Sequence, residues 1–194
     1  MRDNFTGDRV ARHHRRPMGA FFTREGPNIP FTTIQPGEIG DCIDRIGRQW
    51  MLITAGDEQH FNTMTASWGG MGTLFNKPVA TIYVRPQRYT YQFTEQQDTF
   101  SLCFFDPCYR DALTLCGTKS GRDIDKPRAC GLDPIFDTAP YFEQAQLVVL
   151  CRKLYYTDMG DGVFVDKSVE AANYPEKDYH RLYIGEIEKV YRHL

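Results

Sequence analysis

Hydroxyl side chains alternate along one stretch of this chain, residues 62–68, which reads N-T-M-T-A-S-W. If the stretch is a β-strand, Thr63, Thr65 and Ser67 share one face, because successive side chains of a strand point to opposite sides. Three neighbouring hydroxyls suit the phosphate or the alcohol groups of a phosphorylated cofactor. The opposite face would carry Asn62, Met64 and Ala66.

Two arginines lie three residues apart in the next polar stretch, residues 85–90, which reads R-P-Q-R-Y-T. Pro86 ends the apolar run before it, because proline cannot donate a ladder hydrogen bond. The chain is expected to turn there, so that Arg85 and Arg88 can offer two planar guanidinium groups to one anion. This pair is the clearest electrostatic indication of a phosphate site.

A third polar cluster, residues 117–126, brings three cations and two hydroxyls into one loop. Such a mixed-charge run is either a solvated turn or, together with the arginine pair, the completion of a phosphate site. Asp123 and Asp125 argue against a bare anion cradle. We expect these two carboxylates to hold Arg122 and Lys126 in place by ion pairing.

A fourth cluster, residues 174–180, reads Y-P-E-K-D-Y-H and comes immediately before the last expected strand. A single histidine is often a structural or surface residue, but loops at strand ends commonly carry function. His180 is therefore a candidate for facing a ligand, and the structural alternative stays open at this point.

Length and charge limit the class of protein. A chain of 194 residues suits one domain, and its formal net charge of −2 gives little support for nucleic-acid binding. No run approaches the roughly 18 apolar residues of a membrane-spanning helix. We expect a cytoplasmic protein that binds neither nucleic acid nor membrane.

The first 40 residues differ from the rest of the chain. Residues 1–19 contain five arginines and two aspartates, and residues 20–40 are rich in proline and glycine. This composition predicts an N-terminal arm at 1–40, either extended or disordered, followed by one domain at 41–194.

Cysteine and glycine motifs exclude several chemistries. None of the six cysteines forms a C-x-x-C pair, and the five histidines do not supply close ligand pairs for zinc, so we expect no metal site and no redox cysteine. Cys103 and Cys151 fall in apolar strands, where a thiol acts as a small hydrophobe. Neither the phosphate-loop motif nor the dinucleotide G-x-G-x-x-G is present.

Apolar and alternating patterns predict a mainly β fold. Six strands are expected, at 50–55, 61–68, 79–84, 99–105, 145–156 and 180–191. Short helices are expected at 89–96, 109–116 and 127–132. These elements suggest a closed or split antiparallel barrel with short flanking helices.

Five sequence motifs occur along the chain in an order that is typical of one protein family. N-T-M-T-A-S-W-G-G, K-P-V-A, R-P-Q-R-Y-T, C-G-T-K-S-G-R-D-I-D-K and D-Y-H-R-L-Y-I-G-E-I-E together resemble the flavin reductase-like FMN-binding split-barrel family, in particular its flavoredoxin-like branch. The resemblance covers roughly residues 48–191. It implies a six-stranded split antiparallel β-barrel, a homodimer, and FMN held non-covalently near the subunit interface.

The resemblance also implies roles for individual residues. Those that would contact the flavin ring and the ribityl-phosphate are Asn62, Thr63, Met64, Thr65 and Ser67. Those that would lie beside the phosphate are Arg85, Arg88 and Thr90. Those in a loop that would approach the cofactor are Lys119, Ser120 and Arg122.

The segment around His180 departs from the family pattern. Many flavin reductases carry G-D-H there, a motif associated with nicotinamide binding. Here Lys177 replaces the glycine, and Tyr179 separates Asp178 from His180. By resemblance, Asp178 and His180 would bind the donor, and His180 would orient the amide of NADH or NADPH or stabilise charge rather than transfer a proton.

Three hypotheses about function remain from the sequence. The first is an FMN-binding oxidoreductase that passes a hydride from NAD(P)H to FMN and electrons on to an acceptor. The second is a flavoredoxin-type electron carrier that a partner protein reduces without NAD(P)H turnover. The third is a β-barrel binding module without flavin, in which the arginines make only surface ion pairs.

Overall fold

The computed structural model describes residues 30–194, so residues 1–29 of the expected N-terminal arm lie outside the described residues. The strands of the main sheet are β1 (Phe31–Ile34), β2 (Met51–Gly56), β3 (Phe61–Ala66), β4 (Gly69–Leu74), β5 (Lys77–Val84), β6 (Thr99–Phe104), β9 (Leu147–Asp158) and β10 (Arg181–His193). A separate hairpin is formed by β7 (Pro134–Phe136) and β8 (Pro140–Phe142).

Helices are short and lie around the sheet. The α-helices are α1 (Cys42–Asp44), α2 (Tyr89–Gln96), α3 (Arg110–Thr118), α4 (Lys126–Cys130) and α5 (Lys167–Asn173). Single turns of other helix types are η1 (Pro36–Glu38), η2 (Arg45–Gln49), η3 (Pro107–Tyr109) and η4 (Met159–Asp161). Within residues 30–194, no helix combines the length and the apolar character needed to cross a bilayer.

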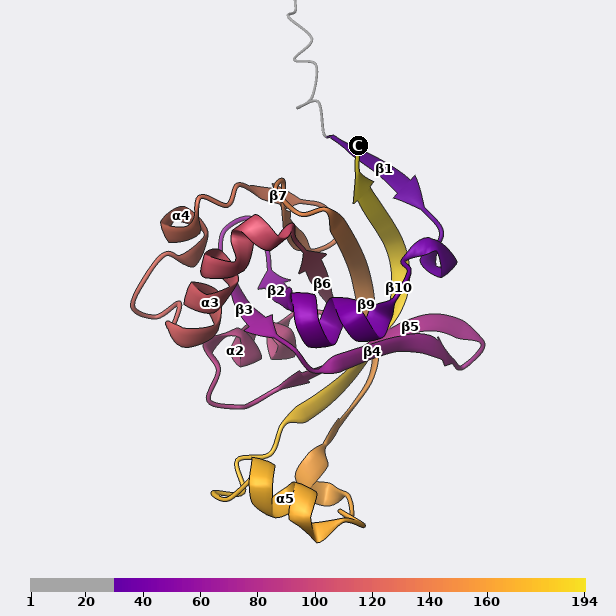
Figure 1. Cartoon of the computed structure of the whole chain (residues 1–194), viewed down its shortest axis with the longest axis vertical. Coiled ribbons are helices and arrows are strands. Elements are labelled where there is room, and N and C mark those ends of the chain that lie inside the picture. The colour runs from indigo at the N-terminus through magenta and orange to yellow at the C-terminus, as the bar shows by residue number, and fades with distance from the viewer. Residues whose placement is uncertain (1–29) are drawn as a thin grey trace, which may run out of the picture.

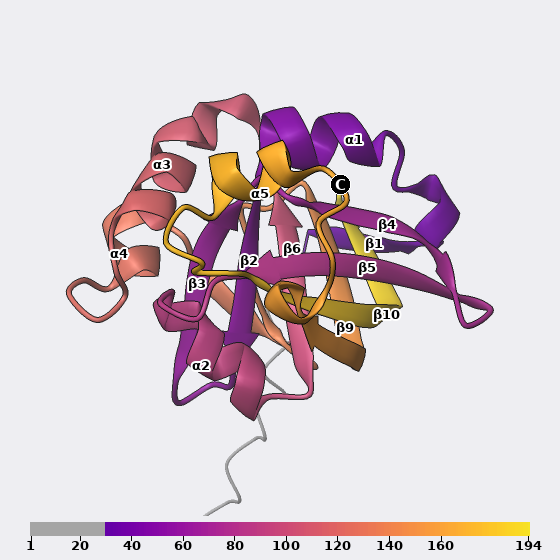
Figure 2. The same cartoon turned by 90° about the horizontal axis from the view of Figure 1, so that it is seen from below.

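The main sheet is antiparallel and curls into a barrel (Figures 1 and 2). Its strands follow the order β3-β2-β6-β9-β10-β5-β4, and β1 pairs with the end of β10. Since this path ends at β3 and β4, the barrel is split between two strands that follow each other in the chain. The predicted mainly β fold with flanking helices is confirmed.

The six strands and three helices expected from the sequence are all present. The sheet has eight strands, because Phe31–Ile34 and the glycine-rich Gly69–Leu74 also pair as strands. Gly69 lets β4 approach β5 closely, since a Cβ there would lie 2.8 Å from the Thr81 carbonyl oxygen. Gly69, Gly70 and Gly72 therefore belong to a strand and not to a tight turn.

Apolar side chains fill both faces of the central strands. On β2, Ile53 belongs to the cluster inside the barrel, whereas Leu52 belongs to a second cluster beneath α3 and the β7–β8 hairpin. Both side chains are fully buried. A strand covered on both faces reads as a continuous apolar run, which explains the pattern M-L-I-T-A at residues 51–55.

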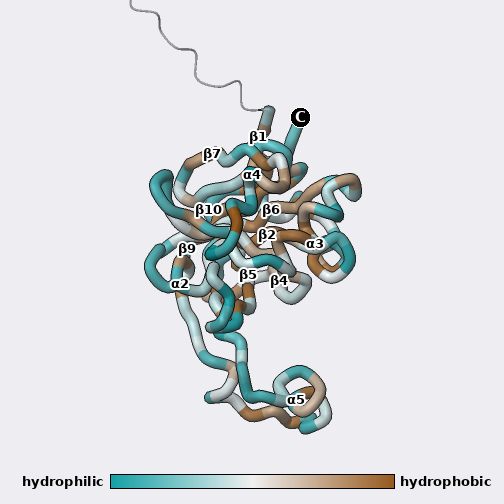
Figure 3. The backbone as a smooth tube through the Cα atoms, turned by 90° about the vertical axis from the view of Figure 1, so that its left-hand side faces the viewer, coloured by the Kyte–Doolittle hydropathy of each residue, from teal (hydrophilic) through white to brown (hydrophobic). Residues whose placement is uncertain are grey.

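Strands β9 and β10 continue beyond the barrel and carry residues 159–180, including α5, away from it as a projecting arm (Figures 1 and 3). The base of this arm is fixed by Arg181, whose Nε and Nη2 donate to the Asp158 carboxylate at 2.7 and 2.6 Å. Arg181 Nη1 also donates to Glu95 of α2 at 2.8 Å. The arm is therefore held to the barrel at the residue that follows His180.

Gly185 provides a test of packing inside the barrel. It lies on β10 at a register shift against β9, and a Cβ there would lie 2.7 Å from the Phe100 ring and 2.9 Å from the Cys151 Cβ. Since these neighbours are buried, Gly185→Ala should lower the free energy of unfolding by about 1–3 kcal/mol. Urea denaturation monitored by circular dichroism measures this change.

The matched control is Gly72→Ala. Gly72 lies on β4, and no atom of residues 30–194 lies within 4 Å of the added Cβ, so the unfolding midpoint of this variant should change little. Equal effects of the two substitutions would contradict the tight packing at Gly185.

Candidate functional site

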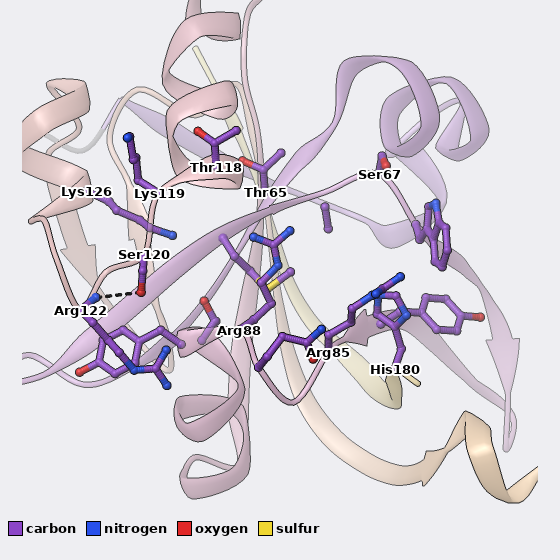
Figure 4. A pocket seen from close by; sticks show the side chains of 17 residues that line it. Thr65, Ser67, Arg85, Arg88, Thr118, Lys119, Ser120, Arg122, Lys126 and His180 are labelled. Carbon is purple, nitrogen blue, oxygen red and sulfur yellow. Dashed lines mark hydrogen bonds between the residues drawn. The ribbon is translucent and has the colours of Figure 1, made fainter. Parts of the chain in front are cut away.

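One cavity of about 540 Å³ opens between the end of β3, the turn from β5 into α2, and the loop after α3 (Figure 4). His180 at the base of the arm closes one side of it. Its volume falls within the roughly 300–1,000 Å³ of small-molecule sites. Four segments that are distant in the sequence therefore contribute to one pocket.

Most of the residues singled out from the sequence line this cavity. Nine of the eleven proposed cofactor-binding residues do so: Met64, Thr65, Ser67, Arg85, Arg88, Thr90, Lys119, Ser120 and Arg122. His180 lines it as well. Lining residues to which the sequence analysis assigned no ligand contact are Ala66, Trp68, Tyr83, Gln87, Tyr89, Thr118 and Lys126.

Asn62 and Thr63 do not line the cavity. The Thr63 hydroxyl is fully buried and bonds to the Thr54 hydroxyl at 2.9 Å. Asn62 Nδ2 donates to the Thr90 hydroxyl at 2.7 Å, and the Asn62 side chain packs against Gly121. Both residues support the cavity wall rather than face a ligand.

The expected face of three hydroxyls is absent for a physical reason. Helix α3 packs on β3, and the Thr65 hydroxyl donates to the carbonyl oxygen of Leu113 in that helix. Gly117 permits this approach, because a Cβ there would lie 3.3 Å from Thr65 Cβ. Only Thr65 and Ser67, at the open end of the strand, reach the cavity.

The two arginines lie in one cavity but have different partners. Arg88 Nη1 donates to the Gly117 carbonyl oxygen at 2.6 Å and so bridges the turn before α2 and the end of α3. Arg85 pairs with Asp178 and donates to the Asn173 carbonyl oxygen at 3.0 Å. Arg85 therefore ties the barrel to the projecting arm, rather than joining Arg88 in a symmetric clamp on one anion.

Asp178 does not line the cavity. Its carboxylate is held by Arg85 and accepts a hydrogen bond from Gln87 Nε2 at 2.8 Å. The expected role of Asp178 in direct donor binding is therefore replaced by a role in holding the arm, because its side chain is already engaged by two groups of the β5–α2 turn.

Lys126 has other partners at this site than those expected from the sequence. Its side chain is only 3% exposed, and Nζ donates to the carbonyl oxygens of Thr63 and Cys116 at 2.9 and 2.8 Å. The expected ion pairing of Arg122 and Lys126 with Asp123 and Asp125 is wrong, because none of these four residues forms an ion pair within residues 30–194. Asp125 instead caps α4 by accepting from the Arg128 main-chain N–H. Burial lowers the pKa of Lys126.

A sequence signal for Lys126 was available. It occupies the first turn of α4, directly after the Asp125 cap and before Pro127. A cation at a helix N-terminus is unfavourable for the helix dipole, so its presence there indicates another role. A lysine ammonium has three donors, and the two carbonyl bonds leave one for the cavity.

The cations of the loop after α3 gather at one end of the cavity, and Trp68 and His180 lie at the other end, beside Arg85 (Figure 4). The Arg122 guanidinium lies over the Tyr89 ring at 4.6 Å, and the main-chain N–H of Arg122 donates to the Ser120 hydroxyl at 3.2 Å. Near the arm, the Trp68 and His180 rings lie 5.0 Å apart. The cavity can therefore accept a ligand that is anionic at one end and flat at the other.

His180 is held as a neutral ring. Burial and the nearby Arg85 and Arg88 guanidinium groups lower the pKa of His180 to about 4, against an opposing contribution from Asp178. Its Nδ1 shares a hydrogen bond of 2.8 Å with the hydroxyl of buried Tyr174. Nε2 is the ring nitrogen left for a ligand, and it is available without a positive charge at neutral pH.

Comparison with known protein families assigns most of the chain to one family. Residues 43–194 match the family described as Flavin reductase like domain. The chain belongs to this family. A search of curated proteins found no match.

Solved structures of low sequence identity share the fold of this family member. An FMN-binding domain of a flavin reductase-like enzyme from Shewanella baltica aligns with a TM-score of 0.61 and 15% identity, over 84% of this chain and 77% of that one. Flavoredoxin from Methanosarcina acetivorans aligns with a TM-score of 0.58 and 20% identity, over 74% and 68%. An NADH:FAD oxidoreductase from Streptomyces globisporus aligns with a TM-score of 0.56 and 16% identity, over 74% and 74%.

The electrostatics of His180 can be tested by titration. The NMR signals of its ring should follow protonation at about pH 4, so the ring is neutral at pH 6. Arg85→Gln removes a cation that disfavours protonation and also releases the Asp178 carboxylate, so both effects raise the pKa of His180 toward its ordinary value. Gln87→Ala, which changes no charge, is the control. Titration of the parent protein near pH 6.5, the ordinary value for histidine, would contradict this assignment.

Proposed function

We propose that this protein is an FMN-binding oxidoreductase that takes a hydride from NADH or NADPH and passes electrons to an acceptor. One observation carries this proposal. Three separate stretches singled out from the sequence contribute their cations and hydroxyls to a single cavity, which also has an aromatic end.

The residues present fit FMN at its phosphorylated end. Arg88, Lys119, Arg122 and Lys126 supply cationic donors, and hydroxyls from Thr118 and Ser120 lie among them. Arginine and lysine are the usual partners of phosphate, because charge-assisted hydrogen bonds are stronger than neutral ones. Lys126 matters most in this set, since its position is already fixed by two carbonyl oxygens.

The other end of the cavity fits a planar ring. Trp68 is 42% exposed, and together with His180 and Tyr83 it provides flat, partly apolar surfaces beside the cavity. FMN, when bound, supplies the hydride and single-electron chemistry that side chains lack. The protein's own contribution is to orient the ring system and to limit the access of water.

His180 suits the binding of a nicotinamide donor. A neutral imidazole can hydrogen-bond an amide through Nε2 without attracting a second anion into the cavity. Tyr174 and the Arg85–Asp178 pair hold the segment that carries His180. We assign to His180 the orientation of the donor amide, and no proton transfer.

A second candidate function is supported by Asp178. This carboxylate is engaged by Arg85 and Gln87 outside the cavity, and the local sequence departs from G-D-H. An incomplete nicotinamide site favours a flavoredoxin-type FMN electron carrier that a partner protein reduces. The two functions share the FMN site and differ in the electron donor.

We also propose that the protein acts as a homodimer. Ile43 in α1 is 87% exposed, and it lines an open apolar groove with Ile46, Trp68 and Met71. This groove shares Ser67, Trp68 and Tyr83 with the cavity. A second copy that covered the groove would bury this apolar surface beside the cofactor site.

Arg88 is the residue of choice for testing FMN binding. Arg88→Ala removes a guanidinium group from the middle of the cavity and should weaken FMN binding by about 1.5–3 kcal/mol, as expected for loss of a hydrogen bond to a charged group. Quenching of FMN fluorescence during titration gives the dissociation constant.

The matched control is Arg128→Ala, which removes an exposed arginine of α4 that does not line the cavity. Its dissociation constant should equal that of the parent protein. An unchanged constant for Arg88→Ala would count against FMN phosphate at this site, and protein that gains no flavin absorbance at all would support the module without flavin.

The electron donor is identified by mixing FMN-loaded protein with NADH and with NADPH in a stopped-flow instrument without oxygen. Loss of the flavin absorbance band within seconds is expected with one of the two nucleotides. His180→Ala should slow this bleaching, and it should weaken FMN binding less than Arg88→Ala does. If dithionite bleaches the protein and neither nucleotide does, the electron-carrier function replaces the reductase function.

A further inference from the structure

Two cysteine thiols lie in contact behind the loop that lines the cavity. Cys116 is in the last turns of α3, and Cys130 ends α4. Their sulfur atoms are 3.7 Å apart. The two helices belong to different segments, so this contact joins the start of the cavity loop to the helix that follows it.

We propose that Cys116 and Cys130 form a reversible disulfide, with hydrogen peroxide as the oxidant, and that this bond braces the cavity loop. Formation of the bond does not depend on the proposed function. Its effect on FMN retention does rest on that function.

The positions of the two sulfurs favour a bond. A disulfide bond is about 2.0 Å long, so the sulfurs at 3.7 Å need to approach by less than the diameter of an atom. Cys130 is the last residue of a five-residue helix, and Gly131 follows it with a φ of 63°. A short helix that ends at a left-handed glycine can shift with little cost to other packing.

The two thiols differ in ways that assign their roles. Cys116 is fully buried, and burial beside Cys130 raises the pKa of Cys116 to about 12. Cys130 is partly exposed, so peroxide can reach it. Cys130 is therefore the thiol that is oxidised first, and Cys116 is the thiol that completes the bond.

The reaction balances with peroxide as the only oxidant. The Cys130 thiol gives its proton to water, and the thiolate attacks one oxygen of hydrogen peroxide. The O–O bond breaks, a sulfenic acid and hydroxide form, and the hydroxide takes up the released proton to give the first water. The Cys116 sulfur then attacks the Cys130 sulfur, the S–O bond breaks, and the departing oxygen leaves as water with the Cys116 proton. In total two thiols lose two electrons, and one peroxide becomes two waters.

The bond would act on the cavity through main-chain carbonyls. The Cys116 carbonyl oxygen accepts from Lys126 Nζ at 2.8 Å, and the neighbouring Gly117 carbonyl oxygen accepts from Arg88 at 2.6 Å. The five lining residues Thr118, Lys119, Ser120, Arg122 and Lys126 all lie between the two cysteines. A covalent closure of this segment limits its opening and fixes the cations that face the cavity.

The first experiment measures the bond itself. Purified full-length protein is treated with hydrogen peroxide, its free thiols are blocked, and tryptic peptides are analysed by mass spectrometry without reduction. A Cys116–Cys130 linked peptide, lost on treatment with dithiothreitol, is expected. Cys116→Ser and Cys130→Ser should each abolish it, and Cys108→Ser, which removes an exposed thiol, should not. Absence of the linked peptide from the parent protein overturns the proposal.

The second experiment measures bracing without reference to FMN. Lys119 and Arg122 are exposed trypsin sites inside the segment. Peroxide-treated protein should be cleaved there at least about threefold more slowly than reduced protein, because cleavage requires local opening. Cys130→Ser should show no such effect of peroxide. Equal cleavage of the oxidised and reduced parent protein overturns the bracing.

The third experiment connects the bond to the cofactor. FMN-loaded protein should lose FMN to a dilute solution more slowly after oxidation than before it, and dithiothreitol should reverse the difference. Equal loss from both forms overturns the link to the cofactor. A protein that binds no FMN would refute the proposed function, whereas the linked peptide and the cleavage rates would still decide the disulfide.

Discussion

A buried ammonium group holds together the part of the molecule in which the cavity lies. A charge removed from water is costly unless its hydrogen bonds are replaced, so Lys126 needs its carbonyl partners. Those partners belong to Thr63 on β3 and Cys116 on α3. The strand, the helix and the loop that returns to α4 are consequently fixed relative to one another by one side chain, and the cations of that loop inherit their positions from it.

The opposite side of the cavity depends on a second tie, between the barrel and the arm. Arg85, which follows β5, pairs with Asp178 in the segment before β10. Arg181, at the start of β10, pairs with Asp158 at the end of β9 and holds the other side of this segment. His180 lies between these two ties. Burial lowers the pKa of His180 most, and the Arg85 guanidinium that holds the arm also disfavours protonation of the imidazole, so Arg85 contributes to both the location and the charge state of His180.

The sequence predicted the positions of the strands and helices better than it predicted which face of a strand meets the cavity. Alternation and apolar runs located six strands, because those patterns report burial directly. Thr63 and Thr65 were expected to share a ligand-facing side, and the sequence pattern could not reveal that α3 covers β3 there. The spacing of nearby residues also could not reveal two distant partners. Lys126 bonds to Thr63, which is 63 residues away in the sequence, and Asp178 bonds to Arg85, which is 93 residues away. Contacts across such separations are decided by how the strands close into a barrel.

The charge distribution shows why local composition was the more useful guide to function. The whole chain has a net charge of −2, a value that alone gives little support for binding a polyanion. The cavity nevertheless gathers Arg85, Arg88, Lys119, Arg122 and Lys126, and Asp178 is the carboxylate that pairs with the first of them. A partly enclosed site concentrates the field of its own cations, while the acidic groups elsewhere on the surface are screened by salt. A chain with a slightly negative net charge can therefore still offer a cationic cavity to a phosphorylated ligand.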